Sequence, residues 1–172
     1  MTEPVGPQAT VERWNRADRE ELIATFLSAC HSARFAEGVA DGRPFRDPDH
    51  VVQLADDVWL RLDPADWLEA LRGHPRIGEN GGTSQEFSRT EQAGMADADA
   101  AIRSAIAAGN QEYEDHFGHV FLIAAAGRTP QDILDNLRSR LNNSAEREIV
   151  EAAEQHRRIT ELRLRRLLST TS

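Results

Sequence analysis

The amino-acid sequence predicts an all-α fold, a single compact multi-helix domain of about seven to nine helices. Three observations favour this class. Apolar residues recur at helical spacing along most of the chain, proline and N-cap signals precede several of these runs, and no stretch clearly alternates between apolar and polar residues. The 172 residues are enough for one domain with a sizeable core.

The chain begins with a polar stretch that contains two prolines and a glycine. We therefore expect a flexible N-terminal tail over 1–14, followed by a helical domain over 15–172. Asp18 opens the first predicted helix, and Glu21 stands where a capping box needs its acidic partner. One apolar face then follows at helical spacing: Leu22, Ile23, Phe26, Leu27 and Cys30.

The next helices have clear start signals. A short helix is expected over 32–40. Asp47-Pro48 and Asp63-Pro64 each combine an N-cap residue with proline at the first helical position, so each predicts a helix start. Gly73 follows the second of these helices, and we expect it to end that helix in a left-handed conformation.

Ser88 and Glu91 repeat the capping-box spacing and predict a long helix that reaches Ala108. Gly109-Asn110 is expected to stop this helix. The apolar run 120–126 fits either a buried strand or a buried helix, because a short run shows no periodicity.

Two further helices complete the chain. Thr129-Pro130 predicts the start of one, and the last is expected to begin at Ser144 and to extend to about Leu168.

Composition narrows the function classes. The net charge of −9, without a basic block to offset it, argues against nucleic acid as a partner. No apolar run approaches the ~20 residues that span a bilayer, so we expect no membrane partner. The N-terminus lacks a secretory signal and the chain ends in Ser-Thr-Thr-Ser, not the peroxisomal Ser-Lys-Leu, which favours a cytoplasmic location. Cys30 is the single cysteine, so no disulfide can form within the chain. We expect this residue in the core.

Two residues are candidates for proton chemistry. His74 lies in a glycine-rich loop after a helix, and an imidazole can exchange a proton near neutral pH; the alternative is a packing or capping histidine. Glu91 has a competing explanation as the acidic member of the Ser88 capping box.

Arg163 is a candidate for anion binding. Its spacing from His156 and Ile159 places it on or beside an apolar stripe of the last helix, where a guanidinium needs an anion or solvent. The alternative is an arginine that covers apolar surface. His116 and His119 have metal-ligand spacing, but no third ligand accompanies them, so no metal site is expected.

Several sequence blocks, in this order, resemble the 2-oxo-4-hydroxy-4-carboxy-5-ureidoimidazoline (OHCU) decarboxylase family, which acts between urate and allantoin. The similarity runs from about Asp18 to Leu168. The blocks are Gly73-His74-Pro75-Arg76-Ile77-Gly78-Glu79, Ser88-Arg89-Thr90-Glu91-Gln92-Ala93-Gly94-Met95, Asn110, Tyr113, Phe117-Gly118-His119-Val120-Phe121, Gly127-Arg128-Thr129 and Ile159-Thr160-Glu161-Leu162-Arg163-Leu164.

The resemblance implies a lyase that converts OHCU to (S)-allantoin stereoselectively, without cofactor or metal, as a homodimer. It implies that His74 and Glu91 are catalytic. The residues implied to bind the ureidoimidazoline substrate are Pro75, Ser88, Gln92, Phe121, Leu122, Ile123 and Arg163. Two alternatives stay open: a non-catalytic helical module that binds a ureide or a partner, and another ureide or purine enzyme on the same scaffold.

Overall fold

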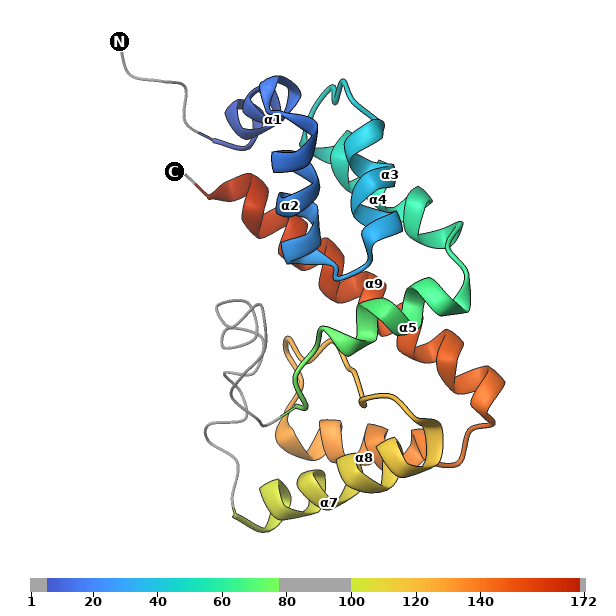
Figure 1. Ribbon diagram of the computed structural model, residues 1–172. Coiled ribbons are helices and arrows are strands. Elements are labelled where there is room, and N and C mark those ends of the chain that lie inside the picture. Colours follow the sequence, from blue (N-terminus) through green and yellow to red (C-terminus); the bar gives the residue numbers. More distant parts are fainter. Residues whose placement is uncertain (1–5, 78–99, 171–172) are drawn as a thin grey trace. The chain divides into compact units, whose positions relative to one another are not determined.

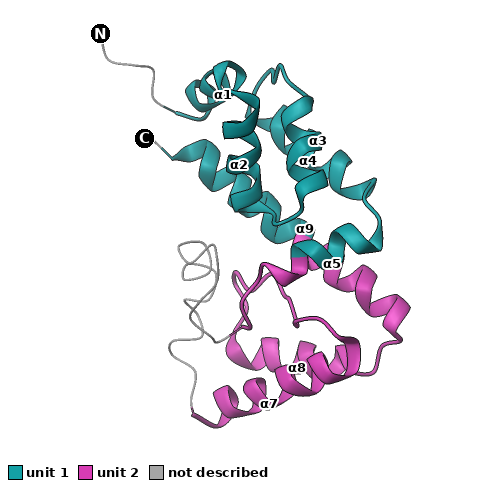
Figure 2. Ribbon diagram, in the orientation of Figure 1, with its two compact units in different colours: residues 1–70, 157–172 teal, residues 71–156 magenta. Residues whose placement is uncertain are grey.

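The computed structural model describes residues 6–77 and 100–170. These residues contain eight α-helices and no strand, which confirms the predicted all-α class (Figure 1). The helices belong to two compact units (Figure 2). Unit 1 comprises residues 1–70 and 157–172, and unit 2 comprises residues 71–156. None of the described helices is both long enough and apolar enough to cross a membrane.

Unit 1 contains α1 (Pro7–Arg16), α2 (Arg19–Ala29), α3 (Ala33–Asp41), α4 (Pro48–Leu60), most of α5 (Pro64–Arg72) and the C-terminal part of α9 (Ala145–Ser169). Helix α3 packs against both α2 and α4, and α1 packs against α4. The start signals at Asp47-Pro48 and Asp63-Pro64 are confirmed. Asp47 caps α4 by accepting a hydrogen bond from the backbone N–H of His50 at 2.7 Å.

Helix α1 occupies residues that the sequence assigned to a flexible tail, so that expectation is wrong from Pro7 onward. The helix is held because Val11 and Trp14 are buried, and the Trp14 ring meets Phe26 edge-on at 5.3 Å. The Asn15 side chain also bonds both the N–H and the C=O of Phe45, each at 2.8 Å.

Two local predictions at helix ends are also wrong. Asp18 stands at the N-cap of α2 but makes no side-chain hydrogen bond there, so the expected capping box does not form. Gly73 does not have a positive φ. The chain instead leaves α5 in a turn in which the N–H of His74 donates to the C=O of Leu71 at 3.1 Å.

Unit 2 is built around α7 (Ala100–Phe117) and α8 (Pro130–Arg140), which lie side by side (Figure 1). The start of α8 is confirmed, with a complete capping box between Thr129 and Asp132. The core of this unit joins both helices to two non-helical stretches. Its buried members are Ile77, Ile106, Tyr113, Phe121, Ile123, Ile133, Leu134 and Leu137.

Helix α7 runs through Gly109 and Asn110, which the sequence predicted would end it. A Cβ on Gly109 would lie 2.6 Å from Cδ2 of Leu137, so the glycine permits close approach of α7 to α8. The helix ends instead at Gly118, whose φ is 78°.

The apolar run 120–126 is neither helix nor strand. It belongs to the connection from α7 to α8, and Phe121, Leu122 and Ile123 are buried. A buried segment without a backbone ladder must find other partners for its peptide groups. Side chains from α8 and α9 supply some of them.

Candidate functional site

His74 is the last residue of the turn that ends α5, and its side chain is buried. Its ring meets the ring of His156 edge-on, with centroids 4.7 Å apart and planes at 81°. His156 comes from α9 and is fully buried. The His74 imidazole thus packs against a helical residue that lies about eighty residues further along the sequence.

Helix α7 holds the residues that follow His74. The guanidinium of Arg76 makes a two-pronged ion pair with Glu114, with nitrogen–oxygen distances of 2.5 and 2.7 Å. The Asn110 side chain donates to the C=O of Ile77 at 3.1 Å. Arg76 therefore serves to fix the loop, and Pro75, which is half-buried, lies between two anchored positions.

Three predicted site residues, Ser88, Glu91 and Gln92, lie outside the described residues, as does the helix expected to start at Ser88. Their roles and the capping-box explanation of Glu91 stay predictions.

Phe121 and Ile123 of the predicted substrate-binding segment lie in the same hydrophobic core as Ile77 at the end of the His74 loop. Phe121 packs edge-on against Tyr113, with ring centroids 5.3 Å apart. The structure therefore brings the His74 loop and the segment 121–123 into one packed core within unit 2.

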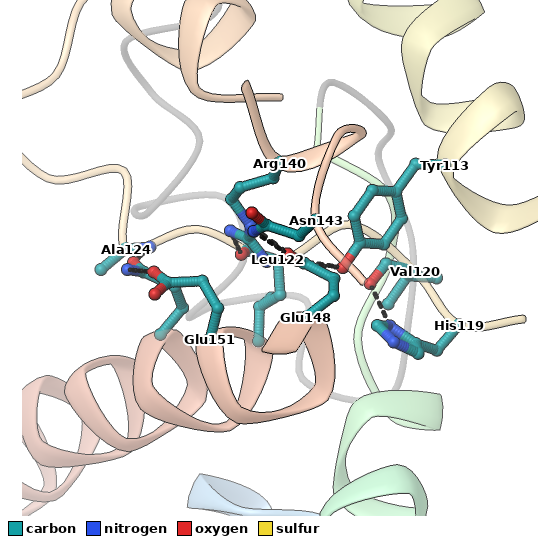
Figure 3. Close-up of polar contacts among 10 residues, drawn as sticks. Tyr113, His119, Val120, Leu122, Ala124, Arg140, Asn143, Glu148 and Glu151 are labelled. Atoms are coloured by element: carbon teal, nitrogen blue, oxygen red, sulfur yellow. Dashed lines mark hydrogen bonds and ion pairs between the residues drawn. The ribbon is translucent and has the colours of Figure 1, made fainter. Parts of the chain in front are cut away.

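A buried ion pair lies beside this segment (Figure 3). Arg140 of α8 contacts Oε1 of Glu148 of α9 through Nε at 2.7 Å and Nη2 at 2.5 Å, and both side chains are almost fully buried. The Tyr113 hydroxyl donates to the same oxygen at 2.5 Å, and Asn143 donates to Oε2 at 2.9 Å. Burial and the hydrogen bond to Glu148 raise the pKa of Tyr113 far above its usual range.

The third guanidinium nitrogen of Arg140, Nη1, bonds to the predicted substrate segment. Its Nη1 donates to the C=O of Leu122 at 2.7 Å, and its guanidinium carbon lies 4.6 Å from the centroid of the Phe121 ring. Removing one partner of such a pair leaves a buried charge uncompensated, which costs about 3–5 kcal/mol. The network therefore joins α7, α8 and α9 around the segment.

Arg163, the predicted anion-binding residue, belongs to unit 1, and its side chain is only 1% exposed. Its Nη1 donates to the C=O of Ala29 at 3.4 Å. Burial, with the nearby positive charge of Arg163, lowers the pKa of His31, which favours a neutral imidazole there. The solvated alternative for Arg163, an arginine that covers apolar surface with its head in water, is therefore wrong.

His116 and His119, the two histidines with metal-ligand spacing, contact protein groups. Nδ1 of His119 lies 3.2 Å from the C=O of Val120, and burial lowers the pKa of this histidine. The ring of His116 packs edge-on against Phe117. Across residues 6–77 and 100–170, no group of three or more His, Cys, Asp or Glu side chains is arranged to hold a metal ion.

Unit 1 also has a cavity of about 330 Å³ between α4 and α9. Its lining includes Phe35 and Trp59, together with Arg157 and Asp56, which form an ion pair at 2.5 Å. None of the predicted site residues that the structure describes lines this cavity.

Sequence reasoning missed the roles of His156, Arg140 and Glu148. A signal existed for His156, which precedes Arg163 by seven residues and so shares its helix face. No sequence pattern pairs Arg140 with Glu148, because they lie in different helices with a turn between them.

The sequence matches the family model described as OHCU decarboxylase over residues 15–165. Among relatives, the chain is 33% identical over 147 residues to the uric acid degradation bifunctional protein TTL of Arabidopsis thaliana, covering 81% of this chain and 45% of that protein. It is 28% identical to the 2-oxo-4-hydroxy-4-carboxy-5-ureidoimidazoline decarboxylase of Haloferax volcanii, covering 91% and 95% of the two chains. The chain thus spans less than half of the bifunctional relative.

The fold agrees with these sequence matches. A crystal structure of an OHCU decarboxylase in the presence of (S)-allantoin superposes with a TM-score of 0.75 at 30% identity, covering 88% of this chain and 99% of that one. An (S)-allantoin synthase is similar in fold alone, with a TM-score of 0.71 at 20% identity, covering 98% of this chain and 56% of that one. With its family match over residues 15–165, the chain belongs to the OHCU decarboxylase family.

Proposed function

We propose that this protein decarboxylates 2-oxo-4-hydroxy-4-carboxy-5-ureidoimidazoline to (S)-allantoin. The observation that carries the proposal is His74, a buried imidazole fixed against His156 directly after α5, in a chain that belongs to the OHCU decarboxylase family. The Haloferax volcanii relative, of which this chain covers 95%, has the same activity in its name.

The substrate accounts for a reaction without a cofactor. The carbon that loses the carboxylate is adjacent to a C=N bond, which can take up the electron pair released with CO₂. The nitrogen of that bond takes up one proton to become an N–H. The hydroxyl on the carbon that loses the carboxylate gives up its proton as a carbonyl forms, and one proton is added to one face of the adjacent carbon. The reaction consumes one proton for each carboxylate released, so the enzyme must move protons and select a face.

We assign proton transfer to His74 and Glu91. Ser88, Gln92 and Arg163 would hold polar groups of the substrate, and Pro75, Phe121, Leu122 and Ile123 would form its walls. The burial of His74, Arg163 and the segment 121–123 supports this assignment, because polar contacts strengthen where water is excluded. The roles assigned to Ser88, Glu91 and Gln92 rest on the family resemblance alone.

The test is a coupled assay with freshly made substrate, followed by circular dichroism of the product. The substrate also decays unaided to racemic allantoin, so a catalyst is recognised by a faster reaction and by optically active (S)-allantoin. A folded protein that changes neither the rate nor the optical activity would be a non-catalytic ureide-binding module. Turnover of a different ureide in preference to OHCU would indicate another enzyme of this scaffold.

Two further expectations extend the proposal. The homodimer implied by the resemblance is checked by light scattering coupled to size-exclusion chromatography. The cytoplasmic location expected from the sequence is checked by cell fractionation.

A further inference from the structure

Side chains make most of the backbone hydrogen bonds of the segment 120–126, whose central residues are buried. It has no helical or strand bonds of its own, yet Phe121, Leu122 and Ile123 are at most 7% exposed. Peptide groups in such a place cost free energy unless they are paired. The conformation of the segment is therefore set by whichever side chains bond to it.

Two side chains from separate helices bond the peptide groups on either side of Ile123, while His119 and Arg128 contact the carbonyl groups of Val120 and Ala124. On one side of Ile123, Arg140 of α8 donates to the C=O of Leu122 at 2.7 Å. On the other side, Oε1 of Gln155 of α9 accepts the N–H of Ala124 at 3.0 Å. Figure 3 shows the bonds at Leu122 and Ala124, the two residues that flank Ile123 in the sequence.

Each of the two side chains is itself held in place. Glu148 fixes the guanidinium of Arg140 through Nε and Nη2. Glu151, one turn before Gln155 in α9, accepts a hydrogen bond from Nε2 of Gln155 at 2.8 Å, which orients the amide so that Oε1 faces Ala124. Because both partners are fixed, the peptide groups between them have little freedom to rotate.

Ile123 is the residue between the two bonds. Within the described part of the chain, neither its N–H nor its C=O takes part in a hydrogen bond. A ureide offers both N–H donors and a C=O acceptor, so it complements an open peptide pair. A ligand of this kind would satisfy groups that are otherwise buried and unbonded.

We propose that Gln155 and Arg140 are positioning residues, which fix the peptide groups of Ile123 in the orientation that receives the ureide part of the substrate. This inference rests on the proposed function. Neither side chain is assigned a contact with the substrate. Their effect passes through the backbone of the segment.

Gln155→Met tests the inference with little change of volume, because it removes the acceptor of the Ala124 N–H. We expect KM to rise by about tenfold or more while kcat stays within about threefold, since a contact made equally in the ground and transition states affects KM. The far-ultraviolet circular dichroism should keep its wild-type shape. Hydrogen exchange of residues 120–126 should become faster.

A double exchange provides the rescue. Glu151→Gln with Gln155→Glu keeps an amide and a carboxylate on the same turn of α9, with an acceptor at position 155 for Ala124 and a donor at position 151. We expect KM to return to within about threefold of wild type. The matched control is Gln111→Met, which breaks a similar Gln–acid pair (2.9 Å to Asp115) on the exposed face of α7 and should leave KM unchanged.

The outcomes separate the inference from the proposed function. An inactive wild-type protein refutes the function and this inference with it. An active wild type together with a Gln155→Met variant of unchanged KM and lower melting temperature refutes the inference alone, because the side chain is then only structural. Failure of the double exchange to restore KM also refutes it. Arg140→Lys, which loses the planar fork that bonds Leu122 and Glu148 at once, should also raise KM.

Discussion

The rings of His74 and His156 meet edge-on at 4.7 Å, and both side chains are buried. The leading candidate for proton transfer is therefore oriented by packing against α9. A loop residue that depends on a distant helix in this way is sensitive to changes in that helix as well as in its own loop. It is also buried, so we expect its substitution to lower stability in addition to any effect on turnover.

His74→Asn should lower stereospecific turnover by about two orders of magnitude or more, the usual contribution of a general acid or base. His74→Ala should do the same and, because it also leaves space in a buried site, should lower the free energy of unfolding by about 1–3 kcal/mol. Product circular dichroism and urea unfolding measure the two effects. An Asn variant with near-wild-type turnover would remove His74 from the proposed mechanism.

Arg163→Lys should raise KM by about tenfold or more, equivalent to over ~1.4 kcal/mol of lost binding, because lysine keeps the charge but loses the planar fork. Arg165→Lys is the matched control, since Arg165 is half exposed on the same helix and pairs with Glu161 at 3.0 Å. Steady-state kinetics give KM for both variants and so show whether the guanidinium of Arg163 contributes to substrate binding. If they behave alike, Arg163 is a structural arginine and the substrate needs another anchor.

Glu91→Gln should reduce turnover by one or more orders of magnitude while the melting temperature stays nearly constant. Glutamine is accepted at the third position of a capping box, so the change in stability should be well under ~1 kcal/mol. It removes the negative charge and replaces an acceptor oxygen with a donor. Thermal unfolding and kinetics together distinguish the roles: an active Gln variant would leave Glu91 as a helix cap.

Treatment with EDTA should leave turnover unchanged, because the electron sink of the proposed reaction is in the substrate. The measurement is the initial rate before and after dialysis against the chelator. Loss of activity that one added divalent metal restores would contradict this prediction and would turn attention to His116 and His119.

Cys30 should resist alkylation in the native protein at pH 8, since the thiol is fully buried and burial raises its pKa to about 12. The raised pKa stabilises the fold below pH 9, the ordinary value for a thiol, and this contribution is lost as pH rises from 9 towards 12. The slope is ~1.4 kcal/mol per pH unit. Urea unfolding at pH 8 and pH 10 should show a larger loss for wild type than for Cys30→Ala. Equal losses would mean that the thiol ionises in the folded state.

Sequence signals that act over three or four residues predicted this fold well. Asp47-Pro48 and Thr129-Pro130 begin helices where expected, because an N-cap and a fixed proline φ are local constraints. The role of Gly109 could not be predicted from such local signals. A glycine can stop a helix or admit a neighbouring one, and only the position of Leu137 decides between these roles.

The sequence predicted those members of the candidate site that belong to the sequence blocks shared with the family. His74, Arg163 and Phe121 could be named as candidates from the sequence, and all three are buried, while their roles stay predictions. The partners that orient them could not be named. Whether Arg140 reaches Glu148, or His156 reaches His74, depends on how helices pack, which no local pattern encodes.

Unit 1 draws on both ends of the chain, and this has a consequence for the order of folding during synthesis. Its helices α1 to α4 leave the ribosome first, but Thr160, Leu164 and Leu168, which complete its buried core, are made only after all of unit 2. Domains commonly fold as units from the N-terminus during translation. In this protein, α1 to α4 keep apolar surface exposed until α9 has been synthesised. We therefore expect chaperones to bind the nascent chain during translation.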